Sequence, residues 1–85
     1  MKTIYKYAMP EECRLPIGAK FLHFDIQTGK FSAWFEVDPT MEKEDRTFFV
    51  IGTGMPIVEG EVYLGTVLEG EFVWHLYERV TSVTQ

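Results

Sequence analysis

Apolar and polar residues alternate in two stretches of this chain, and each stretch has a glycine-containing turn near its centre. In the first stretch, Lys20–Val37, a turn at Thr28-Gly29 brings apolar residues of both arms opposite one another. Because successive side chains of a strand point to opposite faces, one turn fixes the facing of both arms. The residues expected in the core are Leu22, Phe24, Ile26, Phe31, Ala33 and Phe35. Lys20–Val37 is therefore predicted to be an antiparallel hairpin with one buried face.

The second stretch, Val62–Tyr77, is rich in β-branched and aromatic residues, which favour a pleated and half-buried strand. A turn at Glu69-Gly70 is expected, since glycine adopts positive φ without steric cost. The predicted cross-strand pairs are Val67 with Phe72, Gly65 with Trp74 and Tyr63 with Leu76 on one face, and Leu64 with His75 on the other. The Trp74 indole would then cover the bare backbone of Gly65. Both faces carry large apolar groups, so this hairpin is expected to be central or covered on both sides.

The rest of the chain contains further short segments of strand-like sequence, separated by glycine, proline and charged residues. Thr3–Ala8 and Arg46–Ile51 are predicted strands. Glu11–Leu15 fits either a brief extended segment or one helical turn, and Thr40–Asp45 fits a charged connection of up to one helical turn. The remaining segments are a loop dense in glycine and proline at Gly52–Gly60 and a polar tail at Arg79–Gln85. About five to seven short strands predict one all-β domain over residues 1–85, either a small antiparallel β-sandwich or a partly open barrel built from consecutive hairpins.

Composition and charge narrow the classes of partner and compartment. The chain has 85 residues, enough for one modest core, and 46% of them are hydrophobic. Thirteen acidic against eight basic residues give a net charge of −5, which disfavours binding to nucleic acid or to anionic membranes. The single cysteine, Cys13, excludes an internal disulfide. Without a signal-peptide pattern or an apolar run of the ~20 residues that a transmembrane helix needs, the protein is expected to stay in the cytoplasm.

Two histidines, His23 and His75, are the only imidazoles of the chain, and each is expected on the face opposite the predicted core. His23 pairs with Trp34 across its hairpin and His75 follows Trp74, so the two can line a shared pocket that stacks a planar ligand. The alternative is a structural or interface role. A metal site needs a further ligand and the spacing matches no known signature, so neither a metal nor a cofactor is predicted. No serine, cysteine or lysine has the neighbours of a catalytic nucleophile, so the protein is predicted not to be an enzyme.

The Gly52-Thr53-Gly54 stretch is the second candidate binding element. Its backbone N–H groups can cradle a phosphate, although it lacks the lysine and the following helix of a P-loop. The alternative is a plain turn whose glycines adopt positive φ. Arg46 precedes this loop on the same predicted strand, and arginine grips phosphate or carboxylate with two hydrogen bonds. We therefore predict a small anionic ligand held by Gly52, Thr53 and Gly54 together with Arg46 of this or a neighbouring chain.

The outward faces of the two hairpins predict self-association. Unless they are covered, these faces expose a group of apolar residues, namely Trp34, Val62, Leu64, Val73 and Tyr77. Monomers rarely leave so large a contiguous patch exposed. A homodimer is expected, since two-fold association is the commonest way to cover such a patch.

Four sequence motifs support a family resemblance. They are MKTIYKY at Met1–Tyr7, LPIGAKFL at Leu15–Leu22, R-x-F-x-x-x-G-T-G-x-P-I from Arg46 to Ile57, and YLGTV at Tyr63–Val67. In these motifs, and along nearly its whole length, the chain resembles a family of small phage and prophage proteins that has no assigned activity. By analogy with phage proteins that blunt host defence, the resemblance implies a non-catalytic accessory protein that sequesters a host defence protein or a small anionic, nucleotide-like ligand. The alternative is a structural or assembly accessory of a phage particle.

Overall fold

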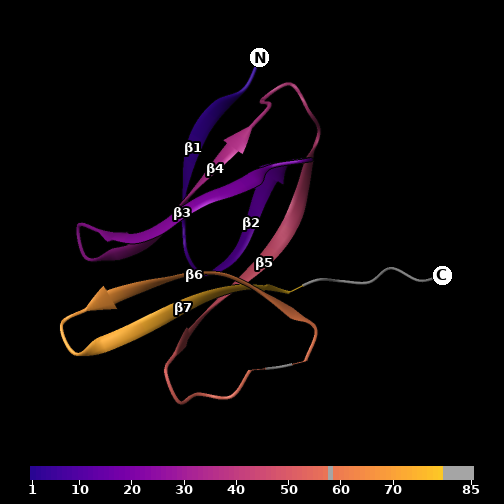
Figure 1. The fold of residues 1–85 in the computed structure, drawn as a ribbon. Coiled ribbons are helices and arrows are strands. Elements are labelled where there is room, and N and C mark those ends of the chain that lie inside the picture. Colours follow the sequence, from indigo (N-terminus) through magenta and orange to yellow (C-terminus); the bar gives the residue numbers. More distant parts are fainter. Residues whose placement is uncertain (58, 80–85) are drawn as a thin grey trace.

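The computed structural model describes residues 1–57 and 59–79. The strands in this part of the chain are β1 (Thr3–Ala8), β2 (Glu11–Pro16), β3 (Lys20–Gln27), β4 (Lys30–Val37), β5 (Lys43–Gly52), β6 (Glu61–Glu69) and β7 (Phe72–Arg79) (Figure 1). They form a three-stranded sheet in the order β1-β4-β3 and a four-stranded sheet in the order β2-β5-β7-β6. Every neighbouring pair is antiparallel, and the sheets do not close into a barrel. The predicted all-β fold is confirmed.

The β3–β4 hairpin has the predicted turn and most of the predicted pairs. Thr28 and Gly29 both adopt positive φ, 49° and 77°, as a type I′ turn requires. One prediction was wrong: Leu22 is the extra residue of a bulge, so Phe21 pairs with Phe35 and Leu22 is 41% exposed. A bulge places two residues opposite one, which ends the simple alternation at this point.

Five of the six predicted core residues of this hairpin lie on its inward face. Phe24, Ala33 and Phe35 are buried, whereas Ile26 and Phe31 are partly buried and pack against the core. The inward face of the hairpin is therefore as predicted from its turn up to the bulge.

The β6–β7 hairpin turns one residue later than predicted, at Gly70-Glu71. Gly70 has a φ of 58° and takes the first position of the turn, the place that glycine occupies in a type II′ turn. Trp74 therefore pairs with Val67, and Gly65 pairs with Leu76. This shift moves each partner by two residues, so Trp74 and Gly65 still face inward although they are not opposite one another.

The backbone of Gly65 is covered by the other sheet, not by Trp74 as predicted. A Cβ atom at Gly65 would lie 3.3 Å from Cζ of Phe21 on β3. A bulge at Leu64 also changes the face on which two residues lie. Leu64, predicted on the face of His75, packs against the core, and Tyr63, predicted on the face of Trp74, pairs with Tyr77 and is 52% exposed. Both corrections come from contacts and irregularities that the alternation of one hairpin does not contain.

The structure decides between the alternatives that the sequence left for Glu11–Leu15 and Thr40–Asp45. Glu11–Pro16 is a strand, and it pairs with the first half of β5. This pairing extends β5 back to Lys43, three residues before the predicted start at Arg46. Asp38 accepts hydrogen bonds from the backbone and the hydroxyl of Thr40, at 3.0 and 2.7 Å, and these bonds lower the pKa of its carboxyl group. They fix a short turn before β5 in place of a helical turn.

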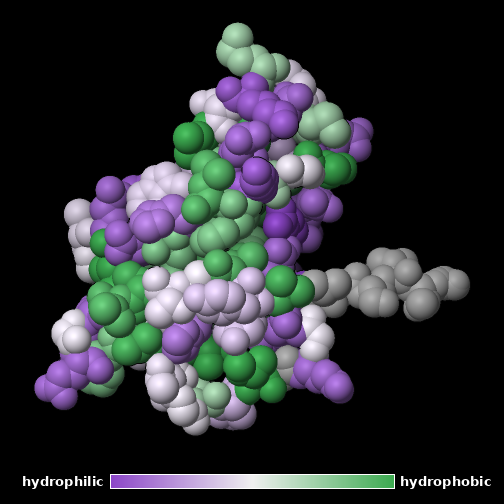
Figure 2. All heavy atoms as spheres, in the orientation of Figure 1, coloured by the Kyte–Doolittle hydropathy of each residue, from purple (hydrophilic) through white to green (hydrophobic). Residues whose placement is uncertain are grey.

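The core lies between the two sheets and draws on both. Its buried residues are Met9, Leu15, Ala19, Phe24, Ala33, Phe35, Val37, Phe48, Val67 and Leu76. The rings of Phe35 on β4 and Phe48 on β5 contact each other with centroids 5.6 Å apart. Hydrophobic residues also reach the surface over the β6–β7 hairpin (Figure 2). The predicted tail at Arg79–Gln85 lies outside the described residues apart from Arg79, which ends β7.

Candidate functional site

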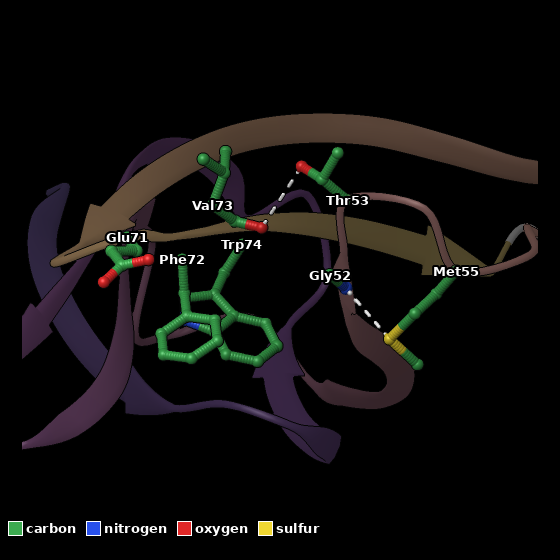
Figure 3. A pocket seen from close by; sticks show the side chains of 7 residues that line it. All are labelled: Gly52, Thr53, Met55, Glu71, Phe72, Val73 and Trp74. Carbon is green, nitrogen blue, oxygen red and sulfur yellow. Dashed lines mark hydrogen bonds between the residues drawn. The ribbon is translucent and has the colours of Figure 1, made fainter.

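A cavity of about 350 Å³ lies between the loop that follows β5 and the first residues of β7 (Figure 3). It is lined by Gly52, Thr53, Met55, Glu71, Phe72, Val73 and Trp74. The pairing of Gly52 with Trp74 across β5 and β7 brings these two segments together. Two residues of the predicted anion site, Gly52 and Thr53, are therefore part of the cavity, although the aromatic residues on its other side were not predicted to belong to it.

A row of aromatic rings connects this cavity to the core. Phe24 stacks on Phe31 at 5.7 Å, Phe31 meets Trp74 edge-on at 5.6 Å, and Trp74 stacks on Phe72 at 5.9 Å. The exposed fraction rises from 3% at Phe24 to 62% at Phe72. Trp74 is further held by a hydrogen bond of 3.1 Å from its Nε1 to Oε1 of Glu69. Its ring is thus fixed in place before any ligand arrives, which lowers the entropy cost of binding.

Gly52 is needed here for space. A Cβ atom at this position would lie 3.2 Å from Cζ3 of Trp74 and 3.3 Å from Sδ of Met55, both closer than ordinary contact. Gly54, with a φ of 95°, has the conformation of the plain turn that was the alternative interpretation of this loop. The two glycines therefore serve different purposes: close packing at the first and chain reversal at the second.

The loop directs several of its N–H groups to the protein itself. The N–H of Thr53 donates to the carbonyl of Val73 at 3.2 Å, and that of Met55 donates to the carbonyl of Gly52 at 3.0 Å. The N–H of Gly52 faces Sδ of Met55 at 3.3 Å. Gly52 and Thr53 are two of the three residues predicted to cradle a phosphate, and the loop as folded does not present their N–H groups to an anion.

Arg46 lies six residues before Gly52 on β5, roughly 20 Å away along the strand. Its Nε and Nη2 donate to Glu78 at 2.6 and 2.8 Å, and its Nη1 donates to the carbonyl of Ala19 at 2.8 Å. The guanidinium also lies over the rings of Phe35 and Phe48, at 5.5 and 5.7 Å. The hydrogen bonds to Glu78 raise the pKa of Arg46. Within one chain, the structure does not bring Arg46 and the loop together, and it gives Arg46 a structural role between the sheets.

His75 lies on β7, with the opposite facing to Trp74, and anchors the start of the loop. Its Nε2 and the hydroxyl of Thr53 are 2.9 Å apart, and its Nδ1 lies 2.9 Å from the hydroxyl of Thr66. The hydroxyl of Tyr63 bonds to Thr66 in turn, at 2.5 Å. Both ring nitrogens of His75 are therefore hydrogen-bonded. The residue does not line the cavity itself, but its bond to Thr53 holds that lining residue in place.

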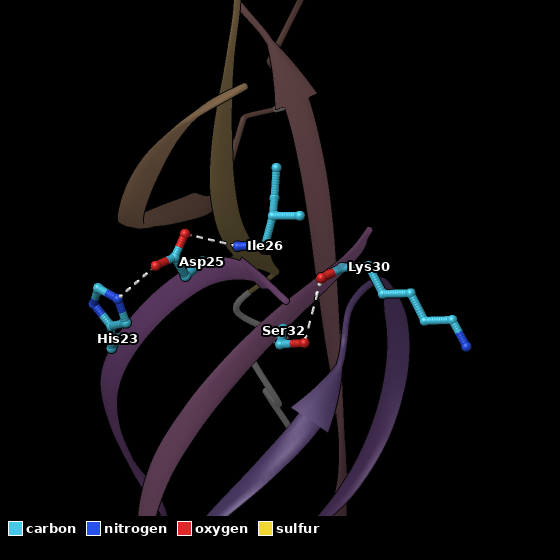
Figure 4. Close-up of polar contacts among 5 residues, drawn as sticks. All are labelled: His23, Asp25, Ile26, Lys30 and Ser32. Carbon is cyan, nitrogen blue, oxygen red and sulfur yellow. Dashed lines mark hydrogen bonds and ion pairs between the residues drawn. The ribbon is translucent and has the colours of Figure 1, made fainter. Parts of the chain in front are cut away.

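His23 and Trp34 form a separate cluster on the outward face of the three-stranded sheet. Their rings are 5.8 Å apart with a tilt of 41°. Nε2 of His23 lies 3.4 Å from Oδ2 of Asp25, whose other oxygen accepts the N–H of Ile26 (Figure 4). That backbone bond is the main cause of a lowered pKa at Asp25. Because His23 and His75 belong to different sheets, the structure does not form the shared pocket that was predicted for them.

Charge is distributed unevenly between the two sheets. Residues 1–8 and 20–40, which hold β1, β3 and β4, contain four lysines and three acidic residues. The rest of the chain contains four basic and ten acidic residues. The cavity lies in this acidic part: Glu71 lines it, and Glu69 bonds to its tryptophan. Among the described residues, no group of histidine, cysteine and carboxylate side chains is placed to hold a metal ion.

The fold and the cavity define a small all-β protein of two open antiparallel sheets with an aromatic-lined cavity at one hairpin end. The chain belongs to the family described as domain of unknown function DUF7352, whose model matches residues 1–85. No curated protein and no solved structure matches the chain. In the part of the chain that the structure describes, no helix is long and apolar enough to cross a membrane.

The sequence contains a signal for this site that lies outside the alternation of apolar and polar residues. Phe72 flanks the β6–β7 turn and is 62% exposed, and Leu68, two residues before the turn, is 70% exposed. At the other hairpin turn, the position of Phe72 is occupied by Lys30. Large apolar residues beside a turn, where polar residues are usual, indicate a surface with a binding role.

Proposed function

We propose that this protein is a non-catalytic binding protein whose binding surface is the tip of the β6–β7 hairpin together with the cavity beside it. The observation that carries the proposal is the aromatic row, which starts in the core and ends at the exposed ring of Phe72. Aromatic side chains anchored by a core are the residues that most often dominate binding energy at an interface. The cavity has the size and the mainly apolar lining of a site for one side chain or a small molecule.

The surroundings of the cavity support a protein partner. Leu68, Phe72 and Met55 are 70%, 62% and 56% exposed, and Figure 2 shows hydrophobic surface over this hairpin. Exposed apolar residues at a hairpin tip beside a preformed cavity suit a partner that covers the tip and inserts one side chain. The phage or prophage setting, and a host protein as the partner, are the part of this proposal that comes from the motifs at Met1–Tyr7 and Arg46–Ile57.

A peptide selection tests the proposal. A displayed library of random peptides is selected on the wild-type protein, and the enriched peptides are measured against Phe72→Ser and against the matched tip variant Lys30→Ser. The enriched peptides should bind wild type and Lys30→Ser equally and lose about tenfold or more with Phe72→Ser, since burying a phenylalanine contributes about 1.5–3 kcal/mol. Thermal melting of both variants checks that they are folded.

Two results would overturn the proposal. One is the absence of any enriched peptide, and the other is a set of peptides that bind Phe72→Ser as well as wild type. Peptides that respond instead to Trp34→Ser would move the binding surface to the outward face of the three-stranded sheet.

A further inference from the structure

We infer that the occupant of the cavity is cationic: a basic segment of a partner protein that inserts an arginine side chain against Phe72 and Trp74. The inference rests on the proposed function and names the chemistry of its ligand. Two features of the molecule support it: the excess of acidic residues, two of which lie at the cavity, and the lining of the cavity.

Two carboxylates lie at the cavity: Glu71 lines it, and Glu69 bonds to Trp74. Outside the three-stranded sheet and its turns, the chain carries ten acidic and four basic residues. Three of those four basic residues are paired within the protein: Arg14 with Asp45, Arg46 with Glu78, and Arg79 with Glu61. Such an excess of one sign attracts a ligand of the opposite sign and speeds its approach.

The lining of the cavity suits a guanidinium group in particular. Glu71 is the one charged residue among the lining residues, and none of them is basic. The stacked rings of Phe72 and Trp74 offer faces for a cation, and the carboxylate of Glu69 holds the edge of Trp74. Arginine is planar and weakly hydrated, so it stacks on aromatic rings and meets a carboxylate at the same time.

An anionic ligand would meet unfavourable surroundings at the same place. A phosphate in the cavity would approach the carboxylate of Glu71, and the N–H groups of Thr53 and Met55 are already bonded within the protein. Arg46 is roughly 20 Å away along β5 and is paired with Glu78. For this reason we favour a cation over the anionic ligand expected from the sequence.

Matched peptides test the inference. The probes are Gly-Gly-X-Gly-Gly peptides with blocked ends, in which X is arginine, its neutral isostere citrulline, norleucine or glutamate. Binding is followed by NMR through the indole N–H signal of Trp74, while the signal of Trp34 on the other sheet serves as an internal reference. The arginine peptide should shift the Trp74 signal and bind about fivefold tighter than the citrulline peptide.

Charge variants and salt test whether the carboxylate of Glu71 causes the preference for arginine over citrulline. Glu71→Gln should remove most of the preference for arginine over citrulline, and Glu12→Gln, an equal change of charge on an exposed site of β2, should preserve it. The preference should shrink between about 0.01 M and about 0.1 M salt, where the screening length falls from roughly 30 Å to roughly 10 Å.

The failures of the two proposals are distinguishable. If citrulline or norleucine peptides shift Trp74 as strongly as the arginine peptide, the cavity is a neutral apolar site, and this inference falls while the proposed function stands. If the glutamate peptide binds best, the anionic ligand is restored and the inference falls. If no peptide shifts Trp74 in the millimolar range, the inference falls, and the library selection alone then decides the proposed function.

Discussion

Replacing Arg46 with leucine is expected to destabilise the fold without changing the binding site. The substitution removes two hydrogen bonds to Glu78 and one to the carbonyl of Ala19, and it leaves the carboxylate of Glu78 without its partner. Breaking a fully buried ion pair in this way costs about 3–5 kcal/mol. Both side chains remain 18% exposed, so water screens part of the loss, and we expect about 2–3 kcal/mol here. For a domain of this size, that corresponds to a melting temperature lower by about 10–20 °C.

Urea unfolding followed by tryptophan fluorescence measures this loss. Arg14→Leu is the matched control, because the pair of Arg14 with Asp45 is 64% and 59% exposed and should contribute less than about 1 kcal/mol. The double variant Arg46→Leu/Glu78→Leu should be more stable than the single Arg46 variant, since it leaves no unpaired buried charge. An Arg46→Leu protein within about 0.5 kcal/mol of wild type would refute the structural role. A folded Arg46→Leu protein that no longer binds the arginine peptide would show that Arg46 takes part in binding.

The remaining predictions concern the core, the cavity and self-association. Leu76→Ala, at a fully buried position, should cost about 2–5 kcal/mol, whereas Leu22→Ala, at the exposed bulge, should cost less than about 1 kcal/mol; equal losses in urea unfolding would contradict the bulge. Gly52→Ala should cost about 1–2 kcal/mol and weaken peptide binding, because its Cβ would displace Trp74 or Met55; a variant with wild-type melting and binding would contradict the close packing. The homodimer stays a prediction, on a smaller surface than expected since Leu64 packs inward, and sedimentation of a 9.9 kDa species at about 100 µM would contradict it.

The parts of the fold that the sequence predicted are those in which two local signals agree. Around Thr28-Gly29, the turn residues and the alternation of both arms require the same register, and the structure has that register. At the second hairpin, Gly70 was compatible with either position of a two-residue turn, and the sequence did not separate the two. Moving the turn by one residue shifts each cross-strand partner by two residues, so every side chain stays on the same face of the hairpin. The predicted inward facing of Trp74 and Leu76 is therefore correct.

The errors arose where distant segments decide the structure. The bulges at Leu22 and Leu64 lie on β3 and β6, near the place where Phe21 packs over Gly65 from the other sheet. No pattern within one hairpin contains that contact. In the same way, the partner of Arg46 is Glu78, thirty-two residues away, so the sequence showed a capable side chain without showing that its hydrogen bonds were already used.

The exposure of the hairpin tip is better explained by binding than by stability. A phenylalanine that is 62% exposed, as Phe72 is, leaves most of its apolar surface in water and adds little to folding. Phe24, at the other end of the aromatic row, is 3% exposed, so the burial of nearly its whole side chain stabilises the fold. Replacing Phe72 with serine should therefore change the melting temperature far less than replacing Phe24 with alanine. The turn between Gln27 and Lys30 shows that this fold forms a hairpin tip without exposed rings. Since folding does not require the apolar residues at the β6–β7 tip, the proposed partner that covers them would account for both their chemistry and their position.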